Sequence, residues 1–402
     1  MIDDDDYRAL VAISNDYIND MTSEGVRYLY NQIDWNARLI CVRGAKGTGK
    51  TTMILQYIKA HYPDRQKALY VSLDDIHFQL YSLYDVAEYA YTHGVEALFV
   101  DEVHYHKHWQ QYIKNIYDRF KGLKIVYTGS SMLQLTTAEA DLSRRQSVYD
   151  LHGFSFREYL WFAKQIRLEP IGLETLLHNH IGLSNEIKTK FKPLELFDEY
   201  LLRGYYPFCL EGAKDYHKRL LSVLDTVIFQ DIPLVEDISF TTLQKARKLL
   251  MILAGQVPFE PNISILCRDI EATRDIVVKI LDLLEKAGLL LLLRKEKNNY
   301  KTLSRPDKIF LNNTNLMYAL NRKINKGTMR ETFFYNQLRV NHDLTMPLKE
   351  DFLTDGQYIF EVGGNDKDFS QIKDIENSYL AVDDVEYGYN NRIPLWMFGL
   401  LY

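Results

Sequence analysis

The chain has 402 residues, of which 47% are hydrophobic and 25% are charged, and its net charge is -6. This balance is typical of a globular protein with about two to four domains, and the negative charge excludes a protein-wide basic field of the kind that attracts nucleic acid. The cysteines Cys41, Cys209 and Cys267 are far apart and form no CxxC pair, which argues against a structural zinc site and a disulfide framework. The amino terminus lacks the pattern of a secretory signal, and the longest apolar run, Leu289 to Leu293, is too short for a membrane span. We therefore expect a cytoplasmic protein with no membrane partner.

The first part of the chain alternates short apolar runs with helical patterns, which begin with aromatic and aliphatic positions at helical spacing over residues 8–35. Helical patterns such as Thr51–His61 and Trp109–Phe120 separate the later runs. Because strands that alternate with helices form a parallel sheet covered on both faces, the predicted fold class is α/β. The runs that we interpret as buried strands are Arg38–Val42, Ala68–Ser72, Ala97–Val100, Lys124–Tyr127 and Val148–Leu151.

The alternation stops near residue 155, and the pattern from Phe156 to about Val235 is helical. A compact unit is expected between residues 241 and 295. Its elements are the helices Thr242–Ala254, one around Ile265 and Arg274–Ala287, then the strand Leu289–Arg294. This is the order of a winged helix, whose wing tip would be Asn298-Asn299.

The final segment, from about Gly327, mixes a helix at Arg330–Arg339 with short strands such as Tyr358–Val362.

Residues Gly44–Thr51, Gly-Ala-Lys-Gly-Thr-Gly-Lys-Thr, fit the pattern G-x-x-x-x-G-K-[ST] in full. The pattern follows a predicted strand and opens a predicted helix, whereas an incidental glycine-rich turn needs neither. The glycines let backbone N–H groups wrap phosphates, and the positive end of the helix faces the same charge. We expect Lys50 to contact the β- and γ-phosphates of ATP and Thr51 to offer its hydroxyl to Mg²⁺. The residues expected to bind the nucleotide are Gly44, Ala45, Lys46, Gly47, Thr48, Gly49, Lys50, Thr51 and Thr52.

A pair of carboxylates ends the predicted strand at Ala97–Val100. Asp101 is placed to hold Mg²⁺ through a water molecule, because Mg²⁺ keeps much of its hydration shell. Glu102 projects one residue further and is placed to orient and polarise an attacking water. Two acids entering a solvated loop are the alternative interpretation, which the complete phosphate-binding loop upstream disfavours.

Two further groups are candidates for the same site. The next strand ends in Thr128-Gly-Ser-Ser131, where Thr128 or Ser130 would sense the γ-phosphate or hold the lytic water, unless the residues only form a turn. Arg144 and Arg145 precede the fifth predicted strand. Either would serve as a finger that reaches the ATP of a neighbouring subunit, and the alternative is a solvated surface arginine.

With these motifs placed, the chain resembles a prokaryotic family of AAA-type ATPases with a C-terminal domain of unknown function. The resemblance rests on Gly44–Thr51, on Asp101-Glu102 followed by Trp109, and on Thr128–Ser131, Leu142–Arg145, Phe154–Tyr159, Arg203–Pro207, Arg330–Phe333, Glu361–Gly364 and Ile393–Trp396. The family usually has a glycine where this chain has Arg144, and Arg145 matches the family's arginine. Arg145 is therefore the favoured finger and Arg144 the alternative.

The resemblance implies that the C-terminal domain is a degenerate restriction-endonuclease fold. Such chemistry needs acids and then an acid-x-Lys sequence that bind a metal ion and activate water. Glu331, Asp351 and Glu361 are the candidate acids, but the lysine position after Glu361-Val362 is Gly363. Lys367 lies further along and is a poor substitute by spacing, so we expect no nuclease activity and a fold kept for packing or partner binding.

The expected parts are a P-loop ATPase domain at residues 1–160, a helical segment at 161–238, a winged-helix-like domain at 239–300 and an α+β domain at 301–402. From Arg274 to Lys286, the recognition helix would carry three positive and three negative side chains, which is not a phosphate-seeking face. Lys295 and Lys297 on the wing add positive charge, as do Lys245, Arg247 and Lys248 on the first helix, so DNA contact and a protein-contact role both stay open.

The leading hypothesis is an ATPase that uses Mg²⁺ and ATP to drive a conformational switch or small motor, with a homo-oligomer and an unidentified protein client as further expected partners. The alternative is an ATP-gated protein that binds or processes nucleic acid. A small-molecule phosphotransferase is disfavoured, because Glu102 beside Asp101 suits activation of water rather than of a bound acceptor.

Overall fold

A computed structural model describes the chain apart from Met1, Ser23, 131–141, Ser143, Ala213, 256–261, 296–305, Arg322, Leu348 and Gln371. It divides into two compact units. The first contains Met1–His152 and Phe229–Ile238, and the second contains Gly153–Ile228 and Ser239–Tyr402. The finer division into domains that the sequence suggests stays a prediction.

The first unit is built on a five-stranded sheet with the order β2-β3-β4-β1-β5, and every pairing in it is parallel. The strands are β1 (Leu39–Gly44), β2 (Ala68–Ser72), β3 (Ala97–Asp101), β4 (Lys124–Ser130) and β5 (Ser147–Asp150). The predicted α/β class is confirmed. Because β1 lies between β4 and β5 in this order, the sequence neighbours β1 and β2 lie apart in the sheet, and the loop after β1 is left open for a ligand.

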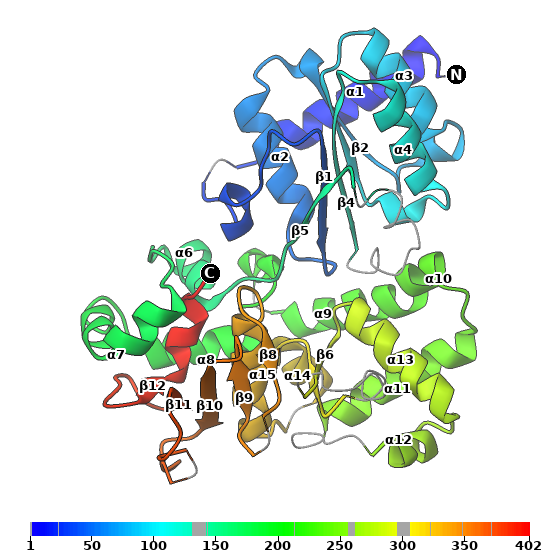
Figure 1. Ribbon diagram of the computed structural model, residues 1–402. Coiled ribbons are helices and arrows are strands. Elements are labelled where there is room, and N and C mark those ends of the chain that lie inside the picture. Colours follow the sequence, from blue (N-terminus) through cyan, green and yellow to red (C-terminus); the bar gives the residue numbers. More distant parts are fainter. Residues whose placement is uncertain are drawn as a thin grey trace. The chain divides into compact units, whose positions relative to one another are not determined.

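Helices cover both faces of this sheet (Figure 1). They are α1 (Asp4–Asn19), α2 (Lys50–His61), α3 (Leu83–Thr92) and α4 (Trp109–Arg119). Alternate side chains of β3 enter different cores: Leu98 and Val100 pack with residues of α3 and α4, whereas Phe99 packs with residues of α2. Both faces are buried, which explains why the strands read as continuous apolar runs.

The edge of the sheet at β2 is shielded by α1. The buried hydroxyl of Ser14 accepts a hydrogen bond of 3.0 Å from the backbone amide of Tyr70. The edge strand is thereby prevented from offering this donor to another chain. Short 3₁₀ turns complete the unit: η1 (Tyr28–Asn31), η2 (Arg65–Lys67), η3 (Ile76–Gln79) and η4 (Val103–Tyr105).

The second unit begins with the expected helical part, comprising α6 (Phe156–Lys164), α7 (Leu173–Ile187), α8 (Pro193–Arg203), the 3₁₀ turn η6 (Pro207–Glu211) and α9 (Tyr216–Thr226). A buried side chain, Asn315, joins several of its elements. Its amide donates to the backbone oxygens of Tyr200 and Leu201, at 3.0 and 2.8 Å, and its oxygen accepts from the backbone amide of Tyr205 at 2.8 Å and from the hydroxyl of Tyr216 at 2.5 Å. A buried polar group satisfied in this way fixes one packing arrangement.

The next elements are α11 (Phe240–Ala254), α12 (Ile263–Asp269), α13 (Arg274–Lys286), β6 (Leu290–Leu293) and β7 (Lys308–Leu311), and β6 pairs antiparallel with β7. Their order and bounds agree with the helices and the strand expected from the sequence. The expected wing tip, Asn298-Asn299, and Lys297 lie outside the described residues. The assignment as a winged helix stays a prediction.

The carboxy-terminal part contains α14 (Thr314–Leu320), α15 (Lys326–Leu338) and a five-stranded mixed sheet with the order β12-β11-β10-β9-β8. Its strands are β8 (Leu344–Thr345), β9 (Phe352–Thr354), β10 (Tyr358–Gly363), β11 (Ser378–Val382) and β12 (Arg392–Pro394), followed by the 3₁₀ helix η9 (Leu395–Leu400). Strands β10, β11 and β12 run parallel to one another. Strand β9 pairs antiparallel with both β10 and β8. Phe334 of α15 packs on the rings of Phe352, Phe360 and Phe398.

In the part of the chain that the structure describes, no helix combines the length and the apolar character that crossing a bilayer requires.

Candidate nucleotide site

The loop from Gly44 to Gly49 joins β1 to α2, as the sequence predicts. Gly47 and Gly49 have φ angles of 84° and 89°, in the left-handed region that favours glycine. At Gly44 the chain passes so close to β5 that a Cβ atom would lie 2.4 Å from the backbone oxygen of Leu151. Gly47 and Gly49 therefore allow the turn, and Gly44 allows close packing against the chain after β5.

Lys50 begins α2, and its ammonium folds back into the loop. The Nζ atom donates to the backbone oxygens of Gly44 at 3.0 Å and Ala45 at 3.3 Å, and the residue is buried. A second cation, Arg27, supports the loop from outside by donating to the backbone oxygen of Thr48 and, at 2.8 Å, to that of His152. Arg27 has no motif around it, and the sequence analysis did not find it.

Asp101 at the end of β3 gathers hydroxyl groups from three neighbouring elements. Its Oδ2 atom accepts from Thr51 at 2.6 Å and from Tyr70 at 3.0 Å, and its Oδ1 atom accepts from Thr128. Asp101 and Thr128 are buried. The structure therefore brings together the two predicted Mg²⁺-binding residues, and it places Thr128 as a group that orients Asp101.

Glu102 follows Asp101 with a φ angle of 49°, which is uncommon for a residue other than glycine. This turn lets its backbone amide donate to Oδ1 of Asp101 at 3.1 Å and to the hydroxyl of Thr128 at 3.3 Å. Burial raises the pKa of the Glu102 carboxyl, and the nearby Lys50 opposes the increase. A carboxyl with a raised pKa and a strained backbone is typical of a functional site.

His104 lies beside Glu102 and was not identified from the sequence. Its Nδ1 atom is 3.4 Å from Oε2 of Glu102 and accepts from the backbone amide of Ser130 at 3.5 Å. Burial, together with Lys50 and Lys46, lowers the pKa of His104 to about 3, so the ring is neutral at neutral pH and the contact with Glu102 is no ion pair. The sequence signal was only a histidine two positions after the carboxylates.

ATP and Mg²⁺ fit this set of groups. A glycine-rich loop that opens a helix suits phosphate, and Lys50 begins that helix. The hydroxyl of Thr51 and the carboxylate of Asp101 are oxygen ligands of the kind that Mg²⁺ prefers. Among the described residues, no group of three or more His, Cys, Asp and Glu side chains is arranged to hold a metal ion.

The predicted arginine fingers lie apart from these residues in sequence. Arg144 is exposed, and the Nε atom of Arg145 lies 3.4 Å from a carboxylate oxygen of Asp118 in α4. An ion pair this exposed contributes little to stability and is easily exchanged for another partner. The finger role of either arginine stays a prediction.

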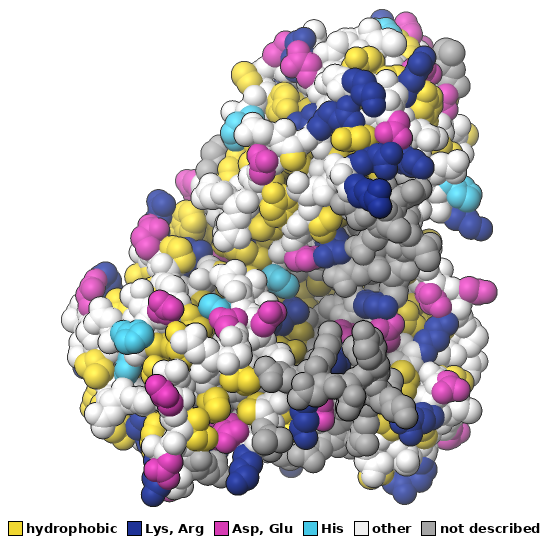
Figure 2. Space-filling view, in the orientation of Figure 1, with side chains coloured by type: hydrophobic (Ala, Val, Ile, Leu, Met, Phe, Trp, Pro, Cys, Tyr) yellow, Lys and Arg dark blue, Asp and Glu magenta, His cyan; other side chains and the backbone are white. Residues whose placement is uncertain are grey.

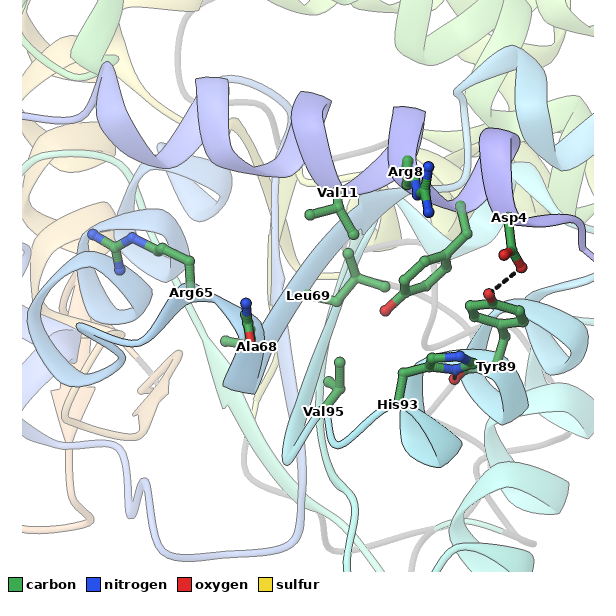
Figure 3. A pocket seen from close by; sticks show the side chains of 11 residues that line it. Asp4, Arg8, Val11, Arg65, Ala68, Leu69, Tyr89, His93 and Val95 are labelled. Atoms are coloured by element: carbon green, nitrogen blue, oxygen red, sulfur yellow. Dashed lines mark hydrogen bonds between the residues drawn. The ribbon is translucent and has the colours of Figure 1, made fainter.

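A cavity of about 460 Å³ lies elsewhere in the first unit, among Tyr7, Tyr89 and His93 and the starting ends of strands β2 and β3 (Figure 3). The rings of Tyr89 and His93 stack with centroids 4.0 Å apart, and Tyr89 donates to Asp4. Ligands of such sheets bind at the carboxyl ends of the strands, where Gly44–Thr51 lie. The cavity is therefore separate from the nucleotide site.

The candidate nuclease acids come together in the second unit. Lys308 bridges two of them: its Nζ atom lies 3.1 Å from Glu331 and 3.0 Å from Asp351. The pKa of Lys308 is raised, because the two carboxylates outweigh the effect of its burial, so the ammonium is charged. A cation of the protein itself thus lies between the carboxylates.

Lys367 comes closer to Glu361 than its spacing along the chain suggests. Its spacing from Glu361 suggested a poor substitute for the missing lysine, yet its Nζ atom lies 2.5 Å from Oε2 of Glu361. Gly363 makes this approach possible, because a Cβ atom there would lie 2.7 Å from the Cβ of Lys367. The chain turns back after β10, which residue spacing alone does not reveal.

With this geometry established, residues 36–160 match a family model described as an AAA domain. These residues are therefore similar to an AAA domain. Residues 194–327 match a model described as a domain of unknown function. A protein of Methanocaldococcus jannaschii, described as uncharacterized, is 30% identical over 267 residues, which are 63% of this chain and 56% of that protein. The match therefore spans little more than half the length of this relative.

Solved structures that are similar to this chain include AMPPCP-bound DnaA from Aquifex aeolicus. Its identity is 14% and the TM-score is 0.28, over 71% of this chain and 90% of that one. The Aeropyrum pernix ORC1 protein in complex with DNA has 11% identity and a TM-score of 0.28 over 79% and 91% of the two chains. The S. cerevisiae Hsp104–ADP complex has 14% identity and a TM-score of 0.30 over 82% and 54%.

Proposed function

We propose that the chain binds Mg-ATP at Gly44–Thr51 and hydrolyses it to drive a conformational switch or small motor. The observation that carries this proposal is the convergence of Lys50, Thr51 and Asp101, through the hydrogen bond between Thr51 and Asp101, at the carboxyl end of a parallel sheet. In this arrangement Lys50 binds the β- and γ-phosphates, and Thr51 and Asp101 hold Mg²⁺, which neutralises phosphate charge when bound.

Glu102 is the proposed base. It lies next to the residue that holds the metal ion, it is largely buried, and its raised pKa brings its proton affinity closer to neutrality, where a general base is most efficient. Ser130, whose amide donates to His104, is the candidate for a γ-phosphate sensor. Thr128 acts through Asp101 in this proposal, because its hydroxyl is directed to that carboxylate.

The client is the open part of the proposal, and we favour a protein over DNA. Helix α13 carries Arg274, Lys279 and Lys286 beside Asp275, Asp282 and Glu285, and the Lys286–Asp282 and Arg294–Glu285 pairs at 2.9 Å neutralise part of its charge. On the face drawn in Figure 2, charges of both signs are mixed over most of the surface, although Lys and Arg side chains gather at its upper right. A sequence-tolerant DNA interface needs a continuous basic face.

The test is the rate of ATP hydrolysis by the full chain with Mg²⁺, measured alone and with duplex or single-stranded DNA. The proposal predicts hydrolysis that DNA leaves unchanged. Stimulation by DNA would replace the protein client by nucleic acid, and the absence of hydrolysis under all conditions would refute the ATPase assignment.

A further inference from the structure

A carboxylate from far downstream in the chain holds a lysine of the phosphate-binding loop. The Nζ atom of Lys46 lies 3.2 and 3.5 Å from the two carboxylate oxygens of Asp231, and 3.2 Å from the hydroxyl of Tyr105. The side chain of Asp231 is 1% exposed, whereas that of Lys46 is 29% exposed. Nothing in the motifs of the first unit accounts for this pair.

Asp231 reaches the loop on a short segment, Phe229–Ile238, which belongs to the first unit although the residues before and after it belong to the second. Asp231 is the last residue of a π-helical turn, Val227–Asp231, and is followed at once by α10 (Ile232–Val235), which contacts η4 beside Glu102. π-helical turns are rare and occur often at functional sites. We call residues 229–238 the return segment.

The charge of Asp231 depends on the loop lysines. Burial raises the pKa of the Asp231 carboxyl, and Lys46 and then Lys50 oppose that effect. Burial by itself would lower the pKa of Lys46, but Asp231 and Tyr105 outweigh it and raise the value. The two groups therefore form an ion pair, and without Lys46 the carboxylate would be buried with less compensating charge, which is unfavourable.

We propose that the phosphates of bound ATP compete with Asp231 for Lys46, so that nucleotide binding weakens the attachment of the return segment. The proposal rests on the nucleotide site described above. Lys46 belongs to the loop proposed to bind the phosphates, and its ammonium is the more exposed of the two partners, so it is the one that can reach a bound phosphate by changing partner. Once it does, Asp231 loses the ion-pair partner that contributes most to its stabilisation, and the return segment is held less tightly.

The coupling is reciprocal. If ATP binding weakens the attachment of the return segment by a given factor, attachment of the segment weakens ATP binding by the same factor. Release of the return segment must therefore strengthen ATP binding. Both ends of the segment continue directly into the second unit, α9 before it and α11 after it. The nucleotide site would thereby control a piece of the first unit whose two ends are joined covalently to the second unit.

The experiment measures amide hydrogen exchange in residues 229–238 of the full chain, with and without Mg²⁺ and a non-hydrolysable ATP analogue, together with the affinity for that analogue. In the parent protein, exchange in the return segment should rise when the analogue binds. In Asp231→Asn, exchange should be raised before the analogue is added, and affinity should increase by about fivefold or more, the lower end of usual couplings between sites.

Lys46→Met separates the proposed competition from a simple loss of negative charge near the phosphates. It should also raise exchange in the return segment, but without any gain in affinity, and adding Asp231→Asn to it should raise exchange no further. Asp237→Asn is the matched control, because it makes the same charge change at an exposed position of the same segment. It should behave as the parent protein does.

The proposal is overturned if the analogue saturates the parent protein while exchange in residues 229–238 stays the same, or if Asp231→Asn changes neither exchange nor affinity. Failure of the nucleotide site itself would appear differently, as a parent protein that binds no analogue. In that case, exchange measured without nucleotide still tests whether the Lys46–Asp231 pair holds the return segment. Equal exchange in the parent protein, in Asp231→Asn and in Lys46→Met would overturn the proposal. Thermal unfolding of each variant checks that the rest of the chain is folded.

Discussion

The hydroxyl of Thr51 donates a hydrogen bond of 2.6 Å to the carboxylate of Asp101, joining the start of α2 to the end of β3. The same carboxylate accepts from Tyr70 and Thr128, so its orientation is fixed from the neighbouring strands on both sides. A site held by rigid elements in this way is preorganised, and small changes to single groups should have large and separable effects.

Lys50→Ala should greatly weaken ATP binding, because it removes the ammonium expected at the β- and γ-phosphates. Hydrogen bonds to charged groups are worth about 1.5–3 kcal/mol, which corresponds to a loss of affinity of about 10-fold to 150-fold. Nucleotide titration measures the effect, with the exposed Lys121→Ala as a control for loss of one positive charge. Unchanged affinity in Lys50→Ala would remove the basis of the P-loop assignment.

Glu102→Gln should retain ATP binding and lose turnover. The amide fills the same space but cannot take up the proton of the attacking water, and general bases typically contribute about 10²-fold to 10⁴-fold in rate. Steady-state hydrolysis and nucleotide titration on the same preparation distinguish the two effects. If the variant turns over ATP as fast as the parent protein, another group is the base.

Thermal stability should increase with pH between about pH 8 and 10.5, because of Lys124. Burial lowers the pKa of this lysine to about 8 from an ordinary value of 10.5, with Asp34 opposing the shift. Between these values the unfolded chain binds more protons than the folded one, so unfolding becomes less favourable as pH rises. Thermal unfolding measured across this range checks the sign.

Lys124→Met should flatten that pH dependence, and Lys121→Met, at an exposed position, should leave it in place. The ammonium of Lys124 donates to the hydroxyl of Tyr57 at 3.2 Å and to the backbone oxygen of Trp35, so the methionine variant also loses these bonds at all pH values. An equal slope in Lys124→Met and in the parent protein would show that other groups cause it.

The purified protein should not cut DNA in the presence of Mg²⁺ or Mn²⁺. Gly363 occupies the lysine position of the expected nuclease pattern, and the ammonium of Lys308 lies between Glu331 and Asp351, where it opposes entry of a second cation. Incubation with plasmid and linear DNA is the assay. Cleavage that disappears in Glu361→Ala would overturn the prediction, and the position of Lys367 beside Glu361 would then identify the working lysine.

If the protein works as an oligomer, Arg145 or Arg144 should complete the site of a neighbouring subunit. Replacing that arginine with alanine should lower turnover by about 10³-fold to 10⁵-fold and leave ATP affinity nearly intact, because the guanidinium stabilises charge that develops during transfer. We favour Arg145, which matches the family's arginine. Its contact with Asp118 is partly exposed and offers little resistance to a change of partner.

Mixing experiments identify a shared site. An Arg145→Ala chain with an intact phosphate-binding loop, combined with a Lys50→Ala chain with an intact arginine, should regain activity. A finger that acts within its own subunit gives no recovery. Mixtures that fail for both Arg144 and Arg145 would leave a self-contained ATPase.

Much of the fold was predictable because its signals are local. The apolar runs of β1 to β4 are largely buried and therefore stand out in the sequence. The bounds expected for α4, α11 and α13 agree with the structure to within about two residues, the usual uncertainty of helix ends. Lys50 and Thr51 were predicted from the phosphate-binding pattern, and Asp101 from the carboxylate pair that ends a buried strand downstream of it. Tyr70 and Arg27 were missed, since neither lies in a recognisable pattern.

The sequence by itself determined the phosphate-binding loop, whose glycines and Lys50 act through backbone conformation and through neighbours a few residues away. Only the tertiary structure decided which distant groups complete the charge balance. Asp231 meets Lys46 across 185 positions, and Lys308 meets Asp351 across 43. The physical reason is that a buried charge must be compensated by whichever opposite charge the packing brings near it, and packing brings together residues whose separation along the chain leaves no periodic or motif signal.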